Sequence, residues 1–302
     1  MPARQFVSLK VLLKTALLRL TTTPLNAYLL PFIPFQRRDN SYVIRQAAPP
    51  PATGQARDLP VPPVALRSSY GPTTEAYLAS GERDVARMLE LLATTGWQLQ
   101  PGARVLELGC AAGRMLRWLA PYAATCELWG TDVSAAHITW CQNYLGSQFS
   151  CFTGTILPHV PFPDATFDCI YAGSVFTHID DLADAWLLEL RRILRPNGRL
   201  YLTIHDRHTI ALLAQQRASP LAQHLYAHPA YRRWIKEPFG KFTIGRAYNS
   251  QVFYDITYLR ARTQGYLDLL RVQPEAYGYQ TAVIFQPKRA AHWPLDESAS
   301  AH

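Results

Sequence analysis

The stretch that most constrains the fold of this chain is residues 104–122, which read as a strand, a tight bend and the start of a helix. The apolar run at 105–108 is long enough for one buried parallel strand. Small residues follow at 109–113, and 114–120 has helical composition until Pro121 ends it. A bend of small residues lets a ligand approach the backbone, and the N-terminus of the next helix offers free N–H groups. The stretch therefore predicts a nucleotide-binding corner.

Two acidic residues near this corner argue against a dinucleotide as the ligand. Glu107 ends the first strand, where a carboxylate would repel a pyrophosphate, and the glycines are spaced Gly109-x-x-x-Gly113. Asp132 ends the next apolar run, 25 residues after Glu107, which is the spacing of an acid that accepts hydrogen bonds from a ribose diol. The pattern favours a ligand that carries an ammonium group or ribose hydroxyls rather than phosphates.

Four segments of the sequence, in this order, resemble the signature of class I S-adenosylmethionine-dependent methyltransferases: Glu107–Gly113, Gly130–Val133, Phe167–Tyr171 and Leu194–Leu200. The run Ser174–His178 is similar to one subgroup of small-molecule bacterial methyltransferases. The resemblance covers roughly residues 75–287. Four elements in order are much more specific than one glycine-rich bend, which many folds contain.

The resemblance implies an α/β fold with a Rossmann-like, mostly parallel sheet of seven strands, an antiparallel last strand and helices on both faces. Beyond the first two strands, apolar runs predict further strands at 149–152, 167–172, 199–204, 267–273 and 278–286, and a return to the core at 251–255. Helices are predicted at 82–93 with Ser80 as the N-cap, at 181–195 before Pro196, and at 256–264.

The resemblance also implies S-adenosylmethionine as the cofactor and no metal. Asp132 is expected to bind the ribose and Glu107 to fix the bend and the amino-acid end. Ala111 stands where many members carry glycine, and Thr155 or Ile156 stands where the family usually places a polar residue facing adenine. The expected cofactor-binding residues lie at the ends of the first four strands: Glu107, Gly109, Cys110, Ala111, Gly113, Asp132, Val133, Thr155, Ile156, Gly173 and Ser174.

Two histidines are the candidate catalytic residues. Methyl transfer from a sulfonium is an in-line displacement, and an oxygen acceptor must also lose its proton to a general base. His178 follows the fourth predicted strand and His205 ends the fifth, at the edge where open α/β sheets bind their ligands. For each histidine the alternative is a structural ring that hydrogen-bonds a backbone group.

Charge and proline content divide the chain into an N-terminal extension with a linker (1–68), the methyltransferase domain (69–288) and a disordered tail (289–302). Residues 1–46 carry seven Lys and Arg against one Asp, so they hold +6 of the formal net charge of +8. A nucleic-acid enzyme would spread basic charge over its working face, so no nucleic-acid partner is predicted.

Two segments have more than one interpretation. Lysines, an arginine and prolines interrupt residues 6–35, so this segment is too broken to span a bilayer. It could lie on a membrane surface, pack on the enzyme or contact a partner subunit of an oligomer. The insert at 207–250 is basic and aromatic and is predicted to form a helical lid over the acceptor. Its charge suits either an acidic acceptor or a solvated helix face.

The predicted function is therefore a cytoplasmic methyltransferase, with membrane association left open. Its small-molecule acceptor would be O-methylated at a sugar, lipid-linked or secondary-metabolite hydroxyl. An NAD-dependent oxidoreductase and a non-catalytic, membrane-associated Rossmann-like module are the alternatives. The five cysteines show no metal-ligand spacing and are predicted to pack in the core of a protein from a reducing compartment.

Overall fold

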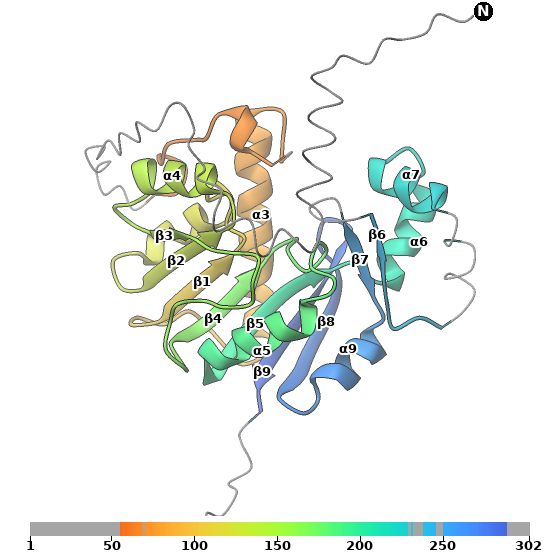
Figure 1. Ribbon diagram of the computed structural model, residues 1–302. Helices are drawn as coiled ribbons and strands as arrows, with labels where there is room; N and C mark the ends of the chain where they lie inside the picture. Colours follow the sequence, from red (N-terminus) through yellow and green to blue (C-terminus); the bar gives the residue numbers. More distant parts are fainter. Residues whose placement is uncertain (1–54, 69, 229–230, 232–237, 246–249, 289–302) are drawn as a thin grey trace, which may run out of the picture. The chain divides into compact units, whose positions relative to one another are not determined.

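The computed structural model describes residues 55–68, 70–228, 231, 238–245 and 250–288 (Figure 1). A seven-stranded sheet with the order β3-β2-β1-β4-β5-β9-β8 is its centre. β1 to β5 are parallel, and β9 runs antiparallel between β5 and β8. The predicted fold class, including the antiparallel last strand, is confirmed. The strands are β1 Arg104–Leu108, β2 Glu127–Asp132, β3 Ser150–Thr153, β4 Phe167–Ala172, β5 Leu194–Ile204, β8 Leu267–Tyr277 and β9 Gln280–Pro287.

Helices cover both faces of this sheet because successive strand residues point to opposite sides. Val105 packs into one apolar cluster and the next residue, Leu106, into another. The first cluster contains residues of α3 (Thr74–Ala93), the 3₁₀ helix η3 (Leu116–Tyr122) and α4 (Ala135–Tyr144). The second contains residues of α5 (Ala183–Ile193) and α9 (Ile256–Thr263). The prediction at 256–264 is thus confirmed to within one residue.

The first helix is longer than the sequence pattern predicts. α3 begins at Thr74 and not at residue 82, because Thr73 is its N-cap and accepts a hydrogen bond from Ala76 N–H. Ser80, the predicted N-cap, and Gly81 therefore lie inside the helix. A Cβ on Gly81 would lie 2.3 Å from the carbonyl oxygen of Arg114, so the glycine lets the residues after the bend pack directly on α3.

Two other helix predictions are wrong at their ends. Residues 109–118 form overlapping turns, so the predicted helix at 114–120 is only η3, and Pro121 lies inside it instead of ending it. α5 ends at Ile193, and β5 begins at Leu194 instead of residue 199. Pro196 disfavours helical backbone at the preceding residue, and Arg195 extends to donate to Asp168 at 2.7 and 2.8 Å.

The segment before α3 is an arm held on the domain by one arginine. Ala56 and Leu59 are buried in the first apolar cluster, and the short 3₁₀ helix η2 (Val64–Leu66) follows. The guanidinium of Arg117 is fully buried and donates to the carbonyl oxygens of Ala56, Leu59 and Pro60. Burial lowers the pKa of Arg117 to about 10, which still leaves the group charged at neutral pH.

Replacing Arg117 with methionine is expected to lower the free energy of unfolding by about 2–3 kcal/mol. The new side chain fills much of the space but leaves three carbonyl groups without their donor. Urea denaturation followed by circular dichroism measures the change. Arg87→Met is the matched control, because Arg87 lies at the surface of α3, where it pairs with Glu90 of the same helix. Equal stability of the two variants would contradict the role assigned to Arg117.

The insert after β5 is only partly helical. It contains α6 (Arg207–Gln215), α7 (Pro220–Ala227) and the strand β6 (Lys241–Ile244), which pairs with β7 (Gln251–Tyr254) in a separate two-stranded sheet. The return at 251–255 is largely buried, and an isolated bridge between Phe253 and His205 connects it to the main sheet. The segments 1–54 and 289–302, with the membrane contact proposed for 6–35, lie outside the described residues. In the part of the chain that is described, no helix is long and apolar enough to cross a bilayer.

Candidate active site

A cavity of about 1030 Å³ opens at the carboxyl ends of the central parallel strands. This volume is at the upper end of the range for small-molecule sites and leaves room for a second ligand beside a nucleoside. Nine of the thirteen expected site residues line it: Gly109, Ala111, Asp132, Val133, Thr155, Ile156, Gly173, Ser174 and His178. The other four, Glu107, Cys110, Gly113 and His205, do not.

The bend after β1 is held in a left-handed conformation. Gly109 and Gly113 have φ values of 77° and 75°, and Ala111 has a φ of 44°. A left-handed alanine costs about 1–2 kcal/mol relative to the right-handed form. The Ala111 N–H donates to Asp132 Oδ2 at 2.9 Å, so the acid at the end of β2 stabilises the bend after β1.

Asp132 is an ionised acceptor at the cavity wall. It accepts from Ala111 N–H and from Ser134 N–H (2.8 Å), and His137 Nδ1 lies 3.8 Å from it. Burial acts to raise the pKa of Asp132, but the neighbouring His137 ring and the hydrogen bonds from the two backbone N–H groups leave it below the usual value. A carboxylate in this state can accept the hydroxyl groups of a ribose.

Glu107, the other expected acid, faces the protein interior. Its carboxyl group is 4% exposed and accepts a hydrogen bond from the Tyr171 hydroxyl at 2.9 Å. Burial raises the pKa of Glu107 to about 8, because the bond from Tyr171 and the charge of Arg114 offset only part of the desolvation. At neutral pH the group is therefore mostly uncharged, and it supports the strand rather than the cavity wall.

α3 supplies a second carboxylate to the cavity that sequence reasoning missed. Asp84 lines the cavity with Ser80, one helical turn before it, and Arg114 Nη1 donates to both (2.8 and 3.1 Å). Burial raises the pKa of Asp84 and Arg114 counteracts it. Arg114 also bonds the Tyr277 hydroxyl and stacks on Tyr70, 4.0 Å from the ring centroid. The four-residue spacing of Ser80 and Asp84 was the available signal, since it places both on one helix face.

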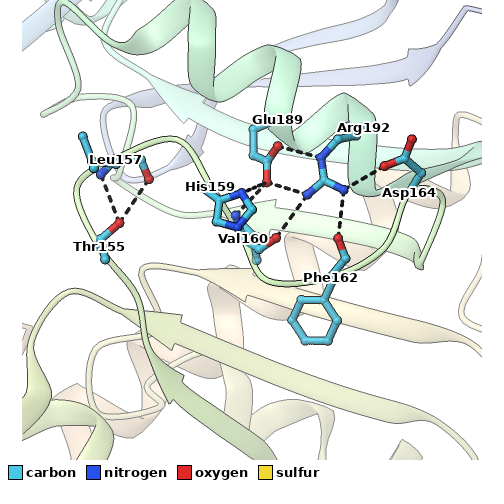
Figure 2. Close-up of polar contacts among 8 residues, drawn as sticks. All are labelled: Thr155, Leu157, His159, Val160, Phe162, Asp164, Glu189 and Arg192. Atoms are coloured by element: carbon cyan, nitrogen blue, oxygen red, sulfur yellow. Dashed lines mark hydrogen bonds and ion pairs between the residues drawn. The ribbon is translucent and has the colours of Figure 1, made fainter.

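The loop after β3 presents apolar side chains to the cavity. Ile156 is 73% exposed and Val133, after β2, is 60% exposed, although both line the cavity. The hydroxyl of Thr155 bonds the backbone N–H and carbonyl of Leu157 (3.2 and 3.3 Å), as Figure 2 shows, and so shapes the loop. Exposed aliphatic groups on a fixed loop suit the flat apolar faces of a base.

Two side chains of α5 hold this loop in place. Glu189 accepts from Val160 N–H at 2.6 Å, and Arg192 donates to the carbonyls of Val160 and Phe162 and to Asp164 (3.1, 2.8 and 2.8 Å; Figure 2). Glu189 and Arg192 also pair with each other one helical turn apart. This network explains how a loop without regular structure keeps a defined wall of the cavity.

The loop after β4 forms the opposite wall. Ser174 has a φ of 59° and donates through its N–H to Thr203 Oγ1 at 2.7 Å. Gln280 accepts from Thr203 (2.6 Å) and donates to Ser174 Oγ (2.8 Å), so the β8–β9 hairpin holds this turn. A Cβ on Gly173 would lie 2.9 Å from the Tyr277 ring, which explains why glycine is needed at this close approach.

The two candidate histidines have different surroundings. His178 is exposed, lines the cavity and bonds the Ser250 carbonyl through Nδ1 at 2.7 Å. Since a carbonyl only accepts, Nδ1 carries the proton and Nε2 is the basic nitrogen of the neutral ring. His205 is 1% exposed, lies between Phe253 and Tyr279, and does not line the cavity. Burial lowers the pKa of His205 to about 4.

The donor set of the cavity fits the adenosyl cofactor that the resemblance implies. An ionised acid is available for a ribose, a bend without bulky side chains for close backbone approach, and apolar groups for a base. Ser80 and Asp84, which Arg114 holds in place, offer acceptors for the ammonium group of an amino acid. In the described residues, no three His, Cys, Asp or Glu side chains are grouped as metal ligands.

Comparisons with known proteins agree with this arrangement. Residues 106–202 match the family model described as a methyltransferase domain. Sterol 24-C-methyltransferase erg6 from Schizosaccharomyces pombe is 32% identical over 104 residues, which cover 33% of this chain and 27% of that protein. Methyltransferase GfsG from Streptomyces halstedii is 32% identical over 138 residues, which cover 44% of this chain and 45% of that protein. The chain thus spans less than half the length of either relative.

A solved structure shares the fold. The PH0226 protein from Pyrococcus horikoshii OT3 superimposes with a TM-score of 0.52 at 17% sequence identity, over 73% of this chain and 95% of that one. At this identity the likeness concerns the arrangement of strands and helices alone.

Proposed function

We propose that this chain, whose residues 106–202 match the methyltransferase-domain model, is a class I S-adenosylmethionine-dependent methyltransferase that methylates a hydroxyl group of a small molecule. The observation that carries the choice of a hydroxyl is the geometry of His178. Its Nδ1–H is fixed by the Ser250 carbonyl, which leaves Nε2 as a base on the cavity wall. When the acceptor is a carbon or a neutral amine, the reaction does not need a base that removes the proton of an alcohol.

The residues of the chain divide the work of the reaction. The bound cofactor supplies the methyl group and the leaving group. Asp132 accepts the ribose hydroxyls, Val133 and Ile156 contact the base, and the Ser174 turn positions the acceptor beside the cofactor. His178 Nε2 takes the proton of the acceptor hydroxyl as the oxygen attacks. The remaining catalytic contribution is alignment of the reacting atoms in a cavity with little water.

Two measurements test this function. Titration calorimetry with S-adenosylmethionine and with NAD separates a methyltransferase from the oxidoreductase alternative, and only the first ligand is expected to bind. Release of S-adenosylhomocysteine is then measured with hydroxylated sugars, lipids and aromatic secondary metabolites, and the new linkage is identified by nuclear magnetic resonance. A methyl group found on carbon, as the name of the sterol relative indicates for that protein, would overturn O-methylation and retain the family.

The amino-acid end of the cofactor is assigned to Ser80 and Asp84 and not to Glu107. Asp84 lines the cavity and is paired with Arg114, whereas Glu107 does not line it and is bonded to Tyr171. Arg114 donates to Asp84 Oδ2 and orients the carboxylate, whereas Oδ1 has only the longer ion pair with Arg83 (3.8 Å), and we assign the ammonium group to this oxygen. α3 packs on the bend through Gly81, so these side chains lie beside the bend that the adenosyl part approaches.

Replacing Asp84 with asparagine is expected to weaken S-adenosylmethionine binding by about 10- to 100-fold, the value of one charged hydrogen bond. Binding of 5′-methylthioadenosine, which lacks the amino-acid end, should change little. The ratio of the two affinities, measured by calorimetry, removes any general effect on the fold. Glu107→Gln is the matched control and should leave the ratio as in the wild type. If the affinity for S-adenosylmethionine relative to that for 5′-methylthioadenosine fell in Glu107→Gln and not in Asp84→Asn, the assignment would be reversed.

A further inference from the structure

Three cysteines from three separate elements meet beneath the bend. Cys110 follows β1, Cys141 lies on α4 and Cys151 on β3. The thiols of Cys110 and Cys141 both donate to the carbonyl of Ala111, at 3.5 and 3.4 Å. Cys151 approaches Cys110 from the neighbouring strand, because Gly130 between them carries no side chain. The methyltransferase reaction uses none of these thiols.

A glycine on the strand between them makes this meeting possible. Gly130 of β2 pairs with Cys151 of β3, and a Cβ on Gly130 would lie 3.0 Å from the Cys110 sulfur. Any other residue at 130 would separate Cys110 from the neighbouring strand. The remaining two cysteines lie apart from this group: Cys126 precedes β2 and bonds the Gln100 carbonyl, and Cys169 is buried in β4.

The three thiols differ in access and acidity. Cys110 and Cys141 are 1% and 0% exposed, whereas Cys151 is partly exposed. The neighbouring thiols of Cys110 and Cys141 lower the pKa of Cys151, whereas its neighbouring thiols together with burial raise the pKa of Cys110. A partly exposed thiol with a lowered pKa, beside a second thiol, is the arrangement in which oxidation to a disulfide is site-selective.

We propose that a peroxide oxidises Cys151 and Cys110 to a disulfide, and that this bond switches off cofactor binding at the site described under the proposed function. The thiolate of Cys151 attacks one peroxide oxygen, so an S–O bond forms, the O–O bond breaks and hydroxide leaves as water after protonation. Cys110 then attacks the sulfenic sulfur, the S–S bond replaces the S–O bond, and the second water carries away the proton of Cys110. Two thiols lose two electrons, and one peroxide gains them.

The consequence for the cofactor follows from the position of Cys110. It is the residue before Ala111, whose left-handed backbone depends on the bond from its N–H to Asp132. A disulfide requires Cβ atoms about 3.5–4.5 Å apart and a dihedral angle near 90°. Drawing Cys110 toward β3 to meet these limits displaces the Ala111 N–H from Asp132. The bend and the ribose acceptor are then disturbed together.

The test measures the bond and the cofactor affinity separately. The full-length reduced protein is treated with hydrogen peroxide, and its intact mass should fall by two hydrogen atoms. Peptide mapping should join Cys110 to Cys151, and S-adenosylmethionine affinity measured by calorimetry should fall at least tenfold, returning with a thiol reductant. Cys151→Ser, with Cys151→Ala as a second variant, should keep its affinity through the treatment. Cys126→Ser is the matched control and should respond as the wild type does.

Each other outcome overturns the proposal. An unchanged mass, a mapped bond from Cys110 to Cys141, or equal loss of affinity in Cys151→Ser would each reject the switch as stated. Gain of oxygen atoms without a disulfide would identify simple oxidation and would also reject it. Failure of the proposed function is a distinct result, since the reduced protein would then not bind S-adenosylmethionine, whereas the thiol chemistry would still be read from the mass.

Discussion

Replacement of Asp132 by alanine is expected to weaken S-adenosylmethionine binding by a factor on the order of 10²–10³, which places it beyond measurement in an ordinary calorimetric titration. Each hydrogen bond from a ribose hydroxyl to a carboxylate contributes about 1.5–3 kcal/mol. The same carboxylate also accepts from the N–H of Ala111, so the variant loses a ligand contact and an anchor of the bend together.

Two further variants make this result specific. Asp132→Asn keeps the shape and one acceptor oxygen, so its loss of affinity should be smaller than that of the alanine variant. Asp181→Ala removes an exposed acid that does not line the cavity, and it should bind as the wild type does. Thermal unfolding of all three shows whether the domain remains folded. Affinity of Asp132→Ala within threefold of the wild type would show that the end of β2 is not the ribose site.

The second large effect is expected for His178→Ala. Loss of a positioned general base costs about 10²–10⁴ in the rate of a proton-coupled step. The expected result is a fall of kcat in this range with S-adenosylmethionine affinity unchanged, because His178 belongs to the wall formed by the loop after β4 and not to the bend.

A base can be distinguished from a structural residue by chemical rescue. Added imidazole should restore part of the rate of His178→Ala if the missing group is a proton acceptor, and it should do nothing if the ring only held the Ser250 segment in place. His208→Ala is the matched control, since His208 is a surface residue paired with Glu275. A decrease of kcat below threefold, or a parallel loss of cofactor affinity, would remove His178 as the base.

Most of the sheet could be predicted from local patterns. The strand at 104–108, the acids at 107 and 132 and the final hairpin all lie where the apolar runs and the family signature place them. These features depend on residues near each other in the chain, because a buried parallel strand needs a continuous apolar run whatever its partners are. The helix boundaries were less predictable. Gly81 packs against the carbonyl of Arg114, and Arg195 pairs with the carboxylate of Asp168. Both partners are distant in the sequence, so local patterns do not reveal them.

The site was predicted in part, for the same reason. Asp132, Ala111 and His178 line the cavity as expected, since each lies at the carboxyl end of a strand or in the loop that follows it. Glu107 lies one residue before the end of β1 and His205 one residue after the end of β5, and both side chains turn into the interior, where Tyr171 and Gln251 bond them. A shift of one residue along a strand decides whether a side chain faces the cavity or the interior. The apolar pattern does not specify the last residue of a strand.

By itself the sequence determined the order of the strands along the chain, the glycine-lined bend and the acid that follows β2, because these are properties of contiguous residues. Only the tertiary structure decided which side chains meet at the cavity. α3 brings Asp84 to the bend, α5 holds the loop after β3 through Glu189, and Gly130 lets Cys110 approach Cys151. The physical reason is that each of these contacts joins elements far apart in the chain, and their close approach depends on packing across the whole sheet.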